Sequence, residues 1–209
     1  MPKKKRRRKP RSTSPSRPRA AASDPRSAID SLLDEFVICR CSAVSLEQAV
    51  DEADHVKPLL VFLVGSHGDP AEIRWTEERI RHLLLELVPR HQWQPRVMLF
   101  AQIAALGEFF EILAAHRRWH RENMEVGAAR ALLGELVLTA LEAVEDPSRP
   151  STPENICAYA ASLGVRVDDA ASLAKFTAWF NGHLTREQRL QISSTGRFEG
   201  WPPNPSESA

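Results

Sequence analysis

The chain has 209 residues, of which 43% are hydrophobic, enough for one domain of about 150 residues with tails. Its formal net charge of +1 averages two opposite parts, because ten of the first twenty residues are Lys or Arg while residues 27–209 hold 17 basic and 26 acidic residues. Three cysteines exclude a disulfide framework, and we find neither an apolar signal-peptide core nor a run of about 18–20 apolar residues typical of a membrane span.

The chain begins with a basic segment, residues 1–23, that is rich in Pro, Ser and Ala and nearly free of large apolar side chains. Such a segment buries too little surface to offset the entropy of ordering, so we expect a disordered arm. Its charge predicts a polyanionic partner such as nucleic acid. The bases that define this basic arm are Lys3, Lys4, Lys5, Arg6, Arg7, Arg8, Lys9 and Arg11.

Residues 24–56 are predicted to form a helical N-terminal extension. Asp24–Pro25 is a helix-start signal, and an apolar stripe at helical spacing follows it through Ile29, Leu33 and Phe36. Ser45 begins a capping-box-like sequence for a short second helix. The next apolar run, residues 59–64, is too short for its periodicity to distinguish helix from strand.

The remaining elements are also predicted to be helical. Asp69–Pro70 opens a helix that we expect Pro89 to stop, and Thr185 with Gln188 caps the last helix. Between them we expect helices over residues 97–119, 124–145, 153–163 and 169–182, with a turn at 146–150. Strand alternation is nearly absent, so the prediction is an all-α protein: a coat domain over residues 57–201 built as an antiparallel four-helix bundle, and a flexible tail over residues 202–209.

Candidate catalytic and metal sites are weak. His116 and His120 have i, i+4 spacing, but the arginines around them favour a solvated basic face over a metal site. Residues 65–69 bring Ser, His and Asp together in one loop, although catalytic triads converge from different elements. No nucleotide-binding loop or nucleophile elbow is present. We therefore expect no enzyme activity, no cofactor and no metal.

Several short motifs resemble tobamovirus coat proteins, in the same order and at similar separations over roughly residues 60–201. Val61-Phe62-Leu63 precedes Asp69-Pro70 and Glu72 as in that family. The later matches are Ala131-Leu132-Leu133-Gly134, the Pro150–Glu154 turn, Arg166-Val167-Asp168-Asp169-Ala170, and Phe198-Glu199 with Trp201. The chain thus resembles a distant coat protein of rod-shaped plant viruses.

The resemblance implies a four-helix bundle that stacks into a helical rod around single-stranded RNA. It places Asp168 and Asp169 at the RNA-facing end and Arg166 beside the inner channel. The family's phosphate-binding arginines are replaced here by a neutral segment, residues 137–141, so the nearest candidates are Arg130 and Arg149. The basic arm has no counterpart in the family.

The resemblance also implies that Glu142 or Glu145, with Glu154, lies near the family's inner-radius carboxylates and faces other carboxylates across a subunit contact. Like charges held together raise one another's pKa and oppose assembly at neutral pH. From the residues alone, an exposed acidic loop is the simpler interpretation, and for Asp168 and Asp169 an N-cap role at the following helix is the simpler one.

The predicted function is a structural capsid protein that self-assembles, packages single-stranded RNA and contacts no membrane, and is found in the virion and the host cytoplasm. The alternative is a nuclear-targeted nucleic-acid-binding or regulatory protein, in which the basic arm is a nuclear localisation signal read by import factors. In that alternative the helices form an interaction module.

Overall fold

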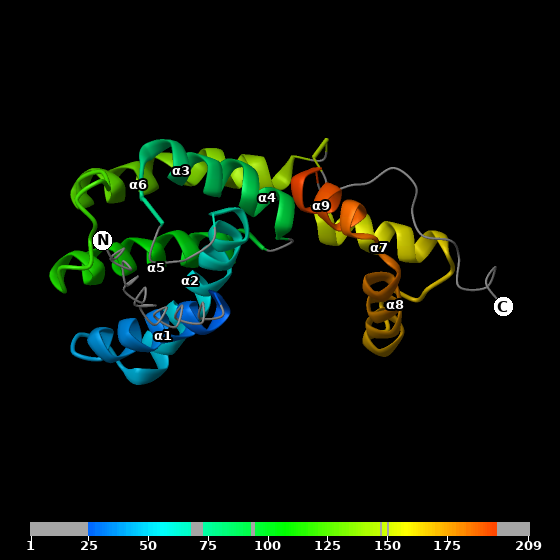
Figure 1. The fold of residues 1–209 in the computed structure, drawn as a ribbon, viewed down its shortest axis with the longest axis horizontal. Helices are drawn as coiled ribbons and strands as arrows, with labels where there is room; N and C mark the ends of the chain where they lie inside the picture. The colour runs from blue at the N-terminus through cyan, green and yellow to red at the C-terminus, as the bar shows by residue number, and fades with distance from the viewer. Residues whose placement is uncertain (1–24, 68–72, 93–94, 147, 150, 196–209) are drawn as a thin grey trace, which may run out of the picture.

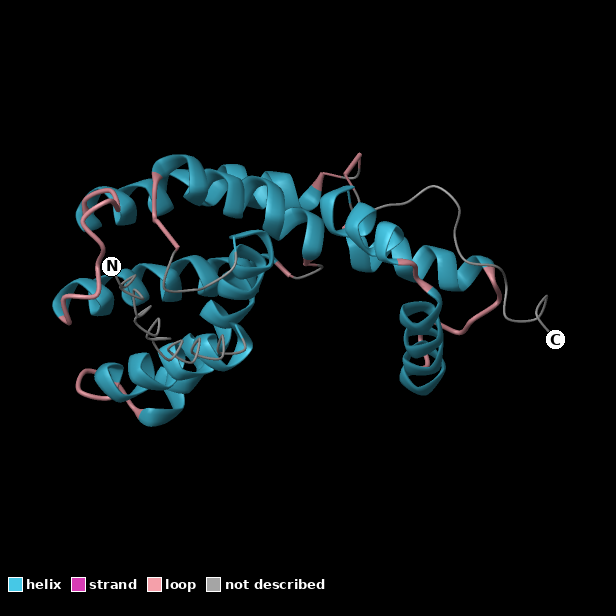
Figure 2. Ribbon diagram, viewed as in Figure 1, coloured by secondary structure: helices cyan, strands magenta, loops and turns pink. Residues whose placement is uncertain are grey.

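The computed structural model describes residues 25–67, 73–92, 95–146, 148–149 and 151–195. These residues form an all-α structure without β-strands (Figure 2). The all-α class predicted from the sequence is confirmed. The basic arm, the Asp69–Pro70 helix start, and Phe198, Trp201 and the tail lie outside the described residues.

The first two helices are α1 (Pro25–Arg40) and α2 (Leu46–His67). Ser45 caps α2, since its Oγ accepts a hydrogen bond from the backbone N–H of Gln48 at 3.2 Å. The ambiguous run at residues 59–64 belongs to α2, and its burial has helical spacing: Leu59 and Leu63 are buried, whereas Val61 is 40% exposed.

The next helical segment starts later and ends later than the sequence predicts. Its first helix, α3, spans Glu77–His82, where Thr76 Oγ1 caps the N-terminus by accepting from the N–H of Arg79. Pro89 does not stop the segment, which continues through a π-helical turn, η2 (Leu83–Leu87), into α4 (Val88–His91). In the π turn the N–H of Val88 bonds to the carbonyl of Leu83, and this widened turn precedes a proline that has no N–H to donate.

The most apolar helix is α5 (Arg96–Ala115), which packs beside α6 (Val126–Glu145). By length and mean hydropathy (1.7) α5 is apolar enough to cross a membrane, so the sequence does hold such a stretch, contrary to our expectation. Half of the 18-residue stretch that has this hydropathy is buried inside the protein. Leu99, Leu106 and Phe110 are fully buried, as in the core helix of a globular domain.

Helices α2, α5, α6 and the segment 77–91 surround one core. In order around this core, α2 contacts α5, α5 contacts α6, α6 contacts η2 and α4, and η2 contacts α2. Helix α1 lies against α2 and α5 (Figure 1). Ile29, Leu33 and Phe36 of α1 are buried in the same core as the residues of α5 and α6. Burial of these three residues confirms the apolar stripe predicted from the sequence.

The C-terminal helices form a second, smaller cluster. It contains α7 (Thr152–Ser162), α8 (Ala170–His183) and α9 (Arg186–Thr195), packed around Ala160, Phe176, Phe180 and Leu184. Figure 1 shows α8 at a steep angle to α7 and apart from the main core.

The domain boundaries predicted from the sequence need correction. Residue 57 lies inside α2, and residues 25–56, whose packing the sequence leaves open, contribute to the main core. Residues 152–195 form their own cluster, so the range 57–201 does not correspond to one core. Which helices share a core is decided by long-range packing, which periodicity along the chain does not report.

Candidate nucleic-acid interface

The candidate phosphate-binding residue Arg130 lies near the start of α6 and is already bonded to carboxylates. Its Nη1 donates to Glu111 Oε1 at 2.6 Å, and its Nη2 lies 3.8 Å from Glu108 Oε1, both on α5. Because the Arg130 side chain is 46% exposed, these ion pairs contribute little stability, and a phosphate can displace them at small cost.

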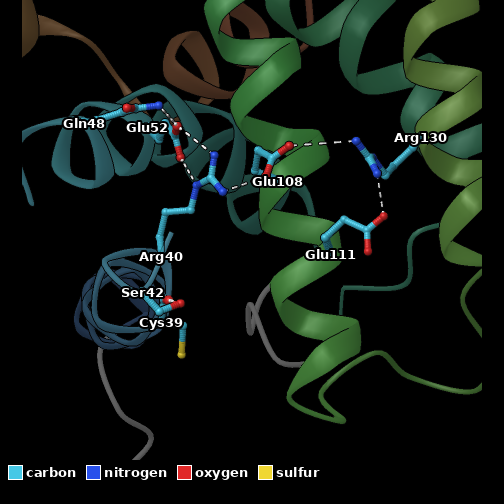
Figure 3. Close-up of polar contacts among 8 residues, drawn as sticks. All are labelled: Cys39, Arg40, Ser42, Gln48, Glu52, Glu108, Glu111 and Arg130. Carbon is cyan, nitrogen blue, oxygen red and sulfur yellow. Dashed lines mark hydrogen bonds and ion pairs between the residues drawn. The ribbon is translucent and has the colours of Figure 1, made fainter. Parts of the chain in front are cut away.

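The pairs of Arg130 belong to a larger ion network across the main core (Figure 3). Arg40, at the end of α1, donates through Nε to Glu52 Oε2 of α2 at 2.6 Å, and its Nη1 lies 3.0 Å from Glu108 Oε2 of α5. Gln48 donates a further hydrogen bond to Glu52 at 3.0 Å. Glu108 therefore bridges Arg40 and Arg130, so that one network connects α1, α2, α5 and α6.

Glu52 is the carboxylate in this network with the strongest partners. The hydrogen bond from Arg40 and, to a lesser extent, that from Gln48 hold the pKa of Glu52 below its usual 4.5, although burial opposes them. The Glu52 side chain is only 15% exposed, so water screens the pair less than a surface pair.

Acidification is therefore expected to weaken the contact between α1 and α2. A carboxyl whose pKa is lowered in the folded state contributes stability above its unfolded pKa, near 4.5, and loses it as the pH falls through the lower folded value. Urea denaturation between about pH 6 and 3 should show a steeper loss of stability in the wild type than in Glu52→Gln. The matched control is Glu47→Gln, at an exposed position on the same helix, and its stability should fall with pH as steeply as that of the wild type. Equally steep losses in all three proteins would mean that the Arg40–Glu52 pair does not stabilise the fold.

The second candidate, Arg149, lies beyond the other end of α6. Its Nη2 donates to Glu86 Oε2 at 2.6 Å, and Arg90 lies 3.5 Å from the same oxygen. Two arginines thus share one carboxylate, which leaves net positive charge where α4 approaches the end of α6. The Glu86–Arg90 spacing of i, i+4 is visible in the sequence, but the approach of Arg149 to that pair is not, and Arg90 was missed for this reason.

The motif Arg166–Asp169 forms the exposed turn between α7 and α8. The side chains of Arg166 and Asp168 are 74% and 83% exposed, and they lie 3.8 Å apart. Asp169 is the N-cap of α8: it accepts a hydrogen bond from the N–H of Ser172 at 3.1 Å and another from the Ser172 hydroxyl, which lowers the pKa of Asp169. The simpler interpretation of Asp169, an N-cap, is confirmed.

The expected inner carboxylates are not gathered into one repulsive cluster within the chain. Glu145 pairs with Arg96, which lowers the pKa of Glu145. Glu154 forms a capping box with Ser151, accepting from the Ser151 N–H at 2.7 Å. Glu142 is exposed and has no hydrogen bond or ion pair with another described residue. Of the three, only Glu142 is free to face another copy of the chain.

The candidate arginines are not brought together in one site. Arg130 and Arg149 lie near opposite ends of α6, separated by most of a helix that rises about 1.5 Å per residue, and Arg166 is in the C-terminal cluster. His116 and His120 do not share a helix face, because α5 ends at Ala115; no group of three or more potential metal ligands occurs among the described residues.

The described residues carry a net negative charge, because their acidic residues outnumber the basic ones, and this charge repels a polyanion. The candidate arginines lie in separate places: Arg130 beside two carboxylates of α5, Arg149 with Arg90, and Arg166 in the α7–α8 turn. Comparison with protein-family models, with curated proteins and with solved structures gives no match to this chain.

Proposed function

We propose that the chain is a non-enzymatic structural subunit, a coat protein that self-associates into a helical nucleoprotein around single-stranded RNA. The proposal combines the ordered series of motifs shared with tobamovirus coat proteins, the all-α fold and the basic arm. It assigns the protein to the virion and the host cytoplasm, with no cofactor. The structural observation that carries it is an exposed apolar strip on α5 and α6.

This strip consists of Val97, Met98 and Phe100 of α5 and Leu138 of α6, which are 69%, 39%, 47% and 70% exposed. The two helices are antiparallel, because Arg96 pairs with Glu145 at one end and Glu111 pairs with Arg130 at the other. Phe100 and Leu138 therefore lie at similar heights along the pair. Large apolar side chains exposed on two adjacent helices are candidates for a protein contact.

A second copy of the chain is the proposed occupant of the strip. A contact between two different faces repeats from copy to copy and generates rings or helical filaments, as a rod requires. The ring of contacts among α2, the segment 77–91, α5 and α6 supports a bundle of the coat-protein type. The separate cluster of α7, α8 and α9 departs from the single bundle over residues 57–201 that the resemblance implies.

RNA would be held mainly through charge. The arm carries ten Lys or Arg residues among its first twenty, and Arg166 supplies an exposed guanidinium beside the α7–α8 turn. Contacts of this kind tolerate any sequence and weaken steeply with salt. Glu142, the unpaired carboxylate near the end of α6, is the residue we propose to oppose assembly at neutral pH.

Electron microscopy of the purified protein with and without RNA, between about pH 5 and 8, tests the proposal. We expect discs or rods, favoured by acidic pH because protonation reduces the repulsion between acidic bodies. Leu138→Glu should raise the protein concentration needed for assembly by at least about tenfold, since assembly would bury an unpaired charge.

The matched control is Leu190→Glu, which changes a leucine that is 60% exposed on α9, outside the strip. It should assemble like the wild type. If only monomers are seen under every condition, the proposal is overturned. If Leu138→Glu and Leu190→Glu affect assembly equally, the strip is not the contact between copies.

The alternative, a nuclear-targeted regulatory protein, is favoured by the Lys3–Lys9 run. Deleting the arm distinguishes the two functions. Loss of nuclear import with no change in assembly favours the regulatory protein, whereas rods that still form but load less RNA favour the coat protein.

A further inference from the structure

An open groove of about 640 Å³ runs between α1 and α2. Its apolar lining comes from both helices, with Leu33 and Val37 on α1 and Val50 and Ala53 on α2. Three aspartates and one lysine line the same groove: Asp30, Asp34, Asp54 and Lys57. The groove therefore combines an apolar lining with a negatively charged edge.

The charges of the groove do not balance. Lys57 Nζ lies 2.8 Å from Asp30 Oδ1, which satisfies that aspartate. Asp54 and Asp34 also act on Lys57, and the three carboxylates together raise the pKa of its ammonium group. Asp34 and Asp54 are exposed and have no hydrogen bond or ion pair with another described residue. One lysine thus faces three carboxylates, and the excess charge is negative.

The surroundings of the groove are apolar as well as acidic. Ile38 is 74% exposed, Leu46 is 65% exposed and Val50 is 42% exposed, on adjoining parts of α1 and α2. Together with the groove lining they form an apolar surface larger than scattered single side chains would give. A segment with small apolar residues and positive charge is the complement of this surface.

The chain contains such a segment immediately before α1. Arg17 and Arg19 are followed by Ala20, Ala21 and Ala22, only a few residues before α1 begins at Pro25. A chain spans up to about 3.3–3.6 Å per residue, so Arg17 can reach about 25 Å from Pro25. Asp34 lies about 14 Å along α1 from the same point, at 1.5 Å per residue. The arm is therefore long enough to fold back onto its own groove.

We propose that the basic arm docks in the α1–α2 groove of its own chain, with its arginines on Asp34 and Asp54. Covalent linkage keeps the arm at a high effective concentration, of the order of millimolar, which favours its own groove over that of another copy. An RNA that binds the arm must displace this contact. The docking itself does not depend on the proposed function; the competition with RNA does.

Zero-length carbodiimide coupling of the full chain at low concentration tests the docking. In the variant Arg17→Lys/Arg19→Lys, which puts primary amines where the arginines dock, we expect amide links from these two positions to Asp34 or Asp54 within monomers, and their loss at about 0.5 M salt. Glu135 on α6 and Glu187 on α9, both exposed, are internal controls and should link at least about fivefold less. Equal linking to both sets would overturn the proposal, and so would links that join isotopically distinct copies.

Trypsin cleavage of the arm gives a readout that does not need the carboxylates as acceptors. In Asp34→Asn/Asp54→Asn the arm should be cut about three- to tenfold faster than in the wild type, because the arm no longer docks in the groove. The control Glu135→Gln/Glu187→Gln removes two charges elsewhere and should be cut at the wild-type rate. Unchanged cleavage of the groove variant would overturn the docking.

RNA binding separates this inference from the proposed function. If the arm binds RNA, the groove variant should bind a single-stranded oligonucleotide about three- to tenfold more tightly at low salt than the Glu135→Gln/Glu187→Gln control does. Carbodiimide links to the groove together with unchanged RNA affinity would mean that the arm docks in the groove but that RNA does not compete with the groove for the arm. No RNA binding by any variant would count against the proposed function and leave the docking in place.

Discussion

Replacing Phe110 by alanine is expected to lower the free energy of unfolding by about 3–5 kcal/mol, the range for large aromatic deletions in a packed core. Phe110 is fully buried in α5, and its ring centroid lies 4.6 Å from that of Trp75 and 5.1 Å from that of Trp119. The surrounding backbone is held by hydrogen bonds, so it cannot easily collapse into the cavity. For example, Trp119 Nε1 donates to the carbonyl of Met124 at 2.9 Å.

Urea denaturation at a concentration where the protein is monomeric measures this loss. The matched control is Phe100→Ala on the same helix, because Phe100 is 47% exposed and should lose no more than about 1 kcal/mol. The difference between the two substitutions reports burial, since helix propensity changes equally in both. Equal losses would mean that the Phe110 cluster does not stabilise the fold.

Neutralising the seven bases of the Lys3–Lys9 run is expected to weaken single-stranded RNA binding at least about 100-fold near 0.1 M salt. Each phosphate neutralised by a base contributes about 0.7 to the slope of log affinity against log salt, so losing seven contacts should flatten that slope by up to about 5. Fluorescence anisotropy of a labelled oligonucleotide, measured across a salt series, gives both quantities.

A scrambled arm that keeps the composition of residues 1–23 is the control. Charge-driven binding tolerates a change of order, so the scrambled arm should retain the wild-type affinity and slope. A neutral arm with unchanged affinity would place RNA binding on the body, at Arg130, Arg149 or Arg166, despite the excess of acidic residues there.

Helix starts were predicted best, because their signals are local. Ser45, Thr185 and Asp169 act as caps at the positions where the sequence places them; for example, Thr185 Oγ1 accepts from the N–H of Gln188 at 3.1 Å. A cap needs only a side-chain acceptor within three residues of an unpaired backbone N–H. No distant part of the chain is involved.

Helix ends and domain boundaries were predicted less well. Pro89 lies inside a helical segment because a π turn precedes it, and the run at residues 59–64 is helical because α2 packs against α1 and α5. The placement of a boundary at residue 57 followed the start of the resemblance, whereas burial of Ile29, Leu33 and Phe36 joins α1 to the main core.

The candidate site shows the same difference between local signals, which the sequence reveals, and long-range contacts, which it does not. The sequence identifies Arg130, Arg149 and Glu145 as charged residues near the ends of a helix, but their partners are 19, 63 and 49 positions away in the chain. Because a partner so far away is brought close only by packing, the sequence cannot say which charges remain free. Glu142 and Arg166 stay available, whereas Glu145 and Glu154 are bonded within the chain.

By itself, then, the sequence determined the all-α class, the caps of several helices, and a charge division between a basic arm and an acidic body, since each depends on residues close together in the chain. The tertiary structure decided that α1 shares the main core, that residues 152–195 pack separately, and that Asp34 and Asp54 meet an apolar groove between α1 and α2. These outcomes depend on which apolar faces bury one another, and many pairings of similar helices satisfy the same periodicity.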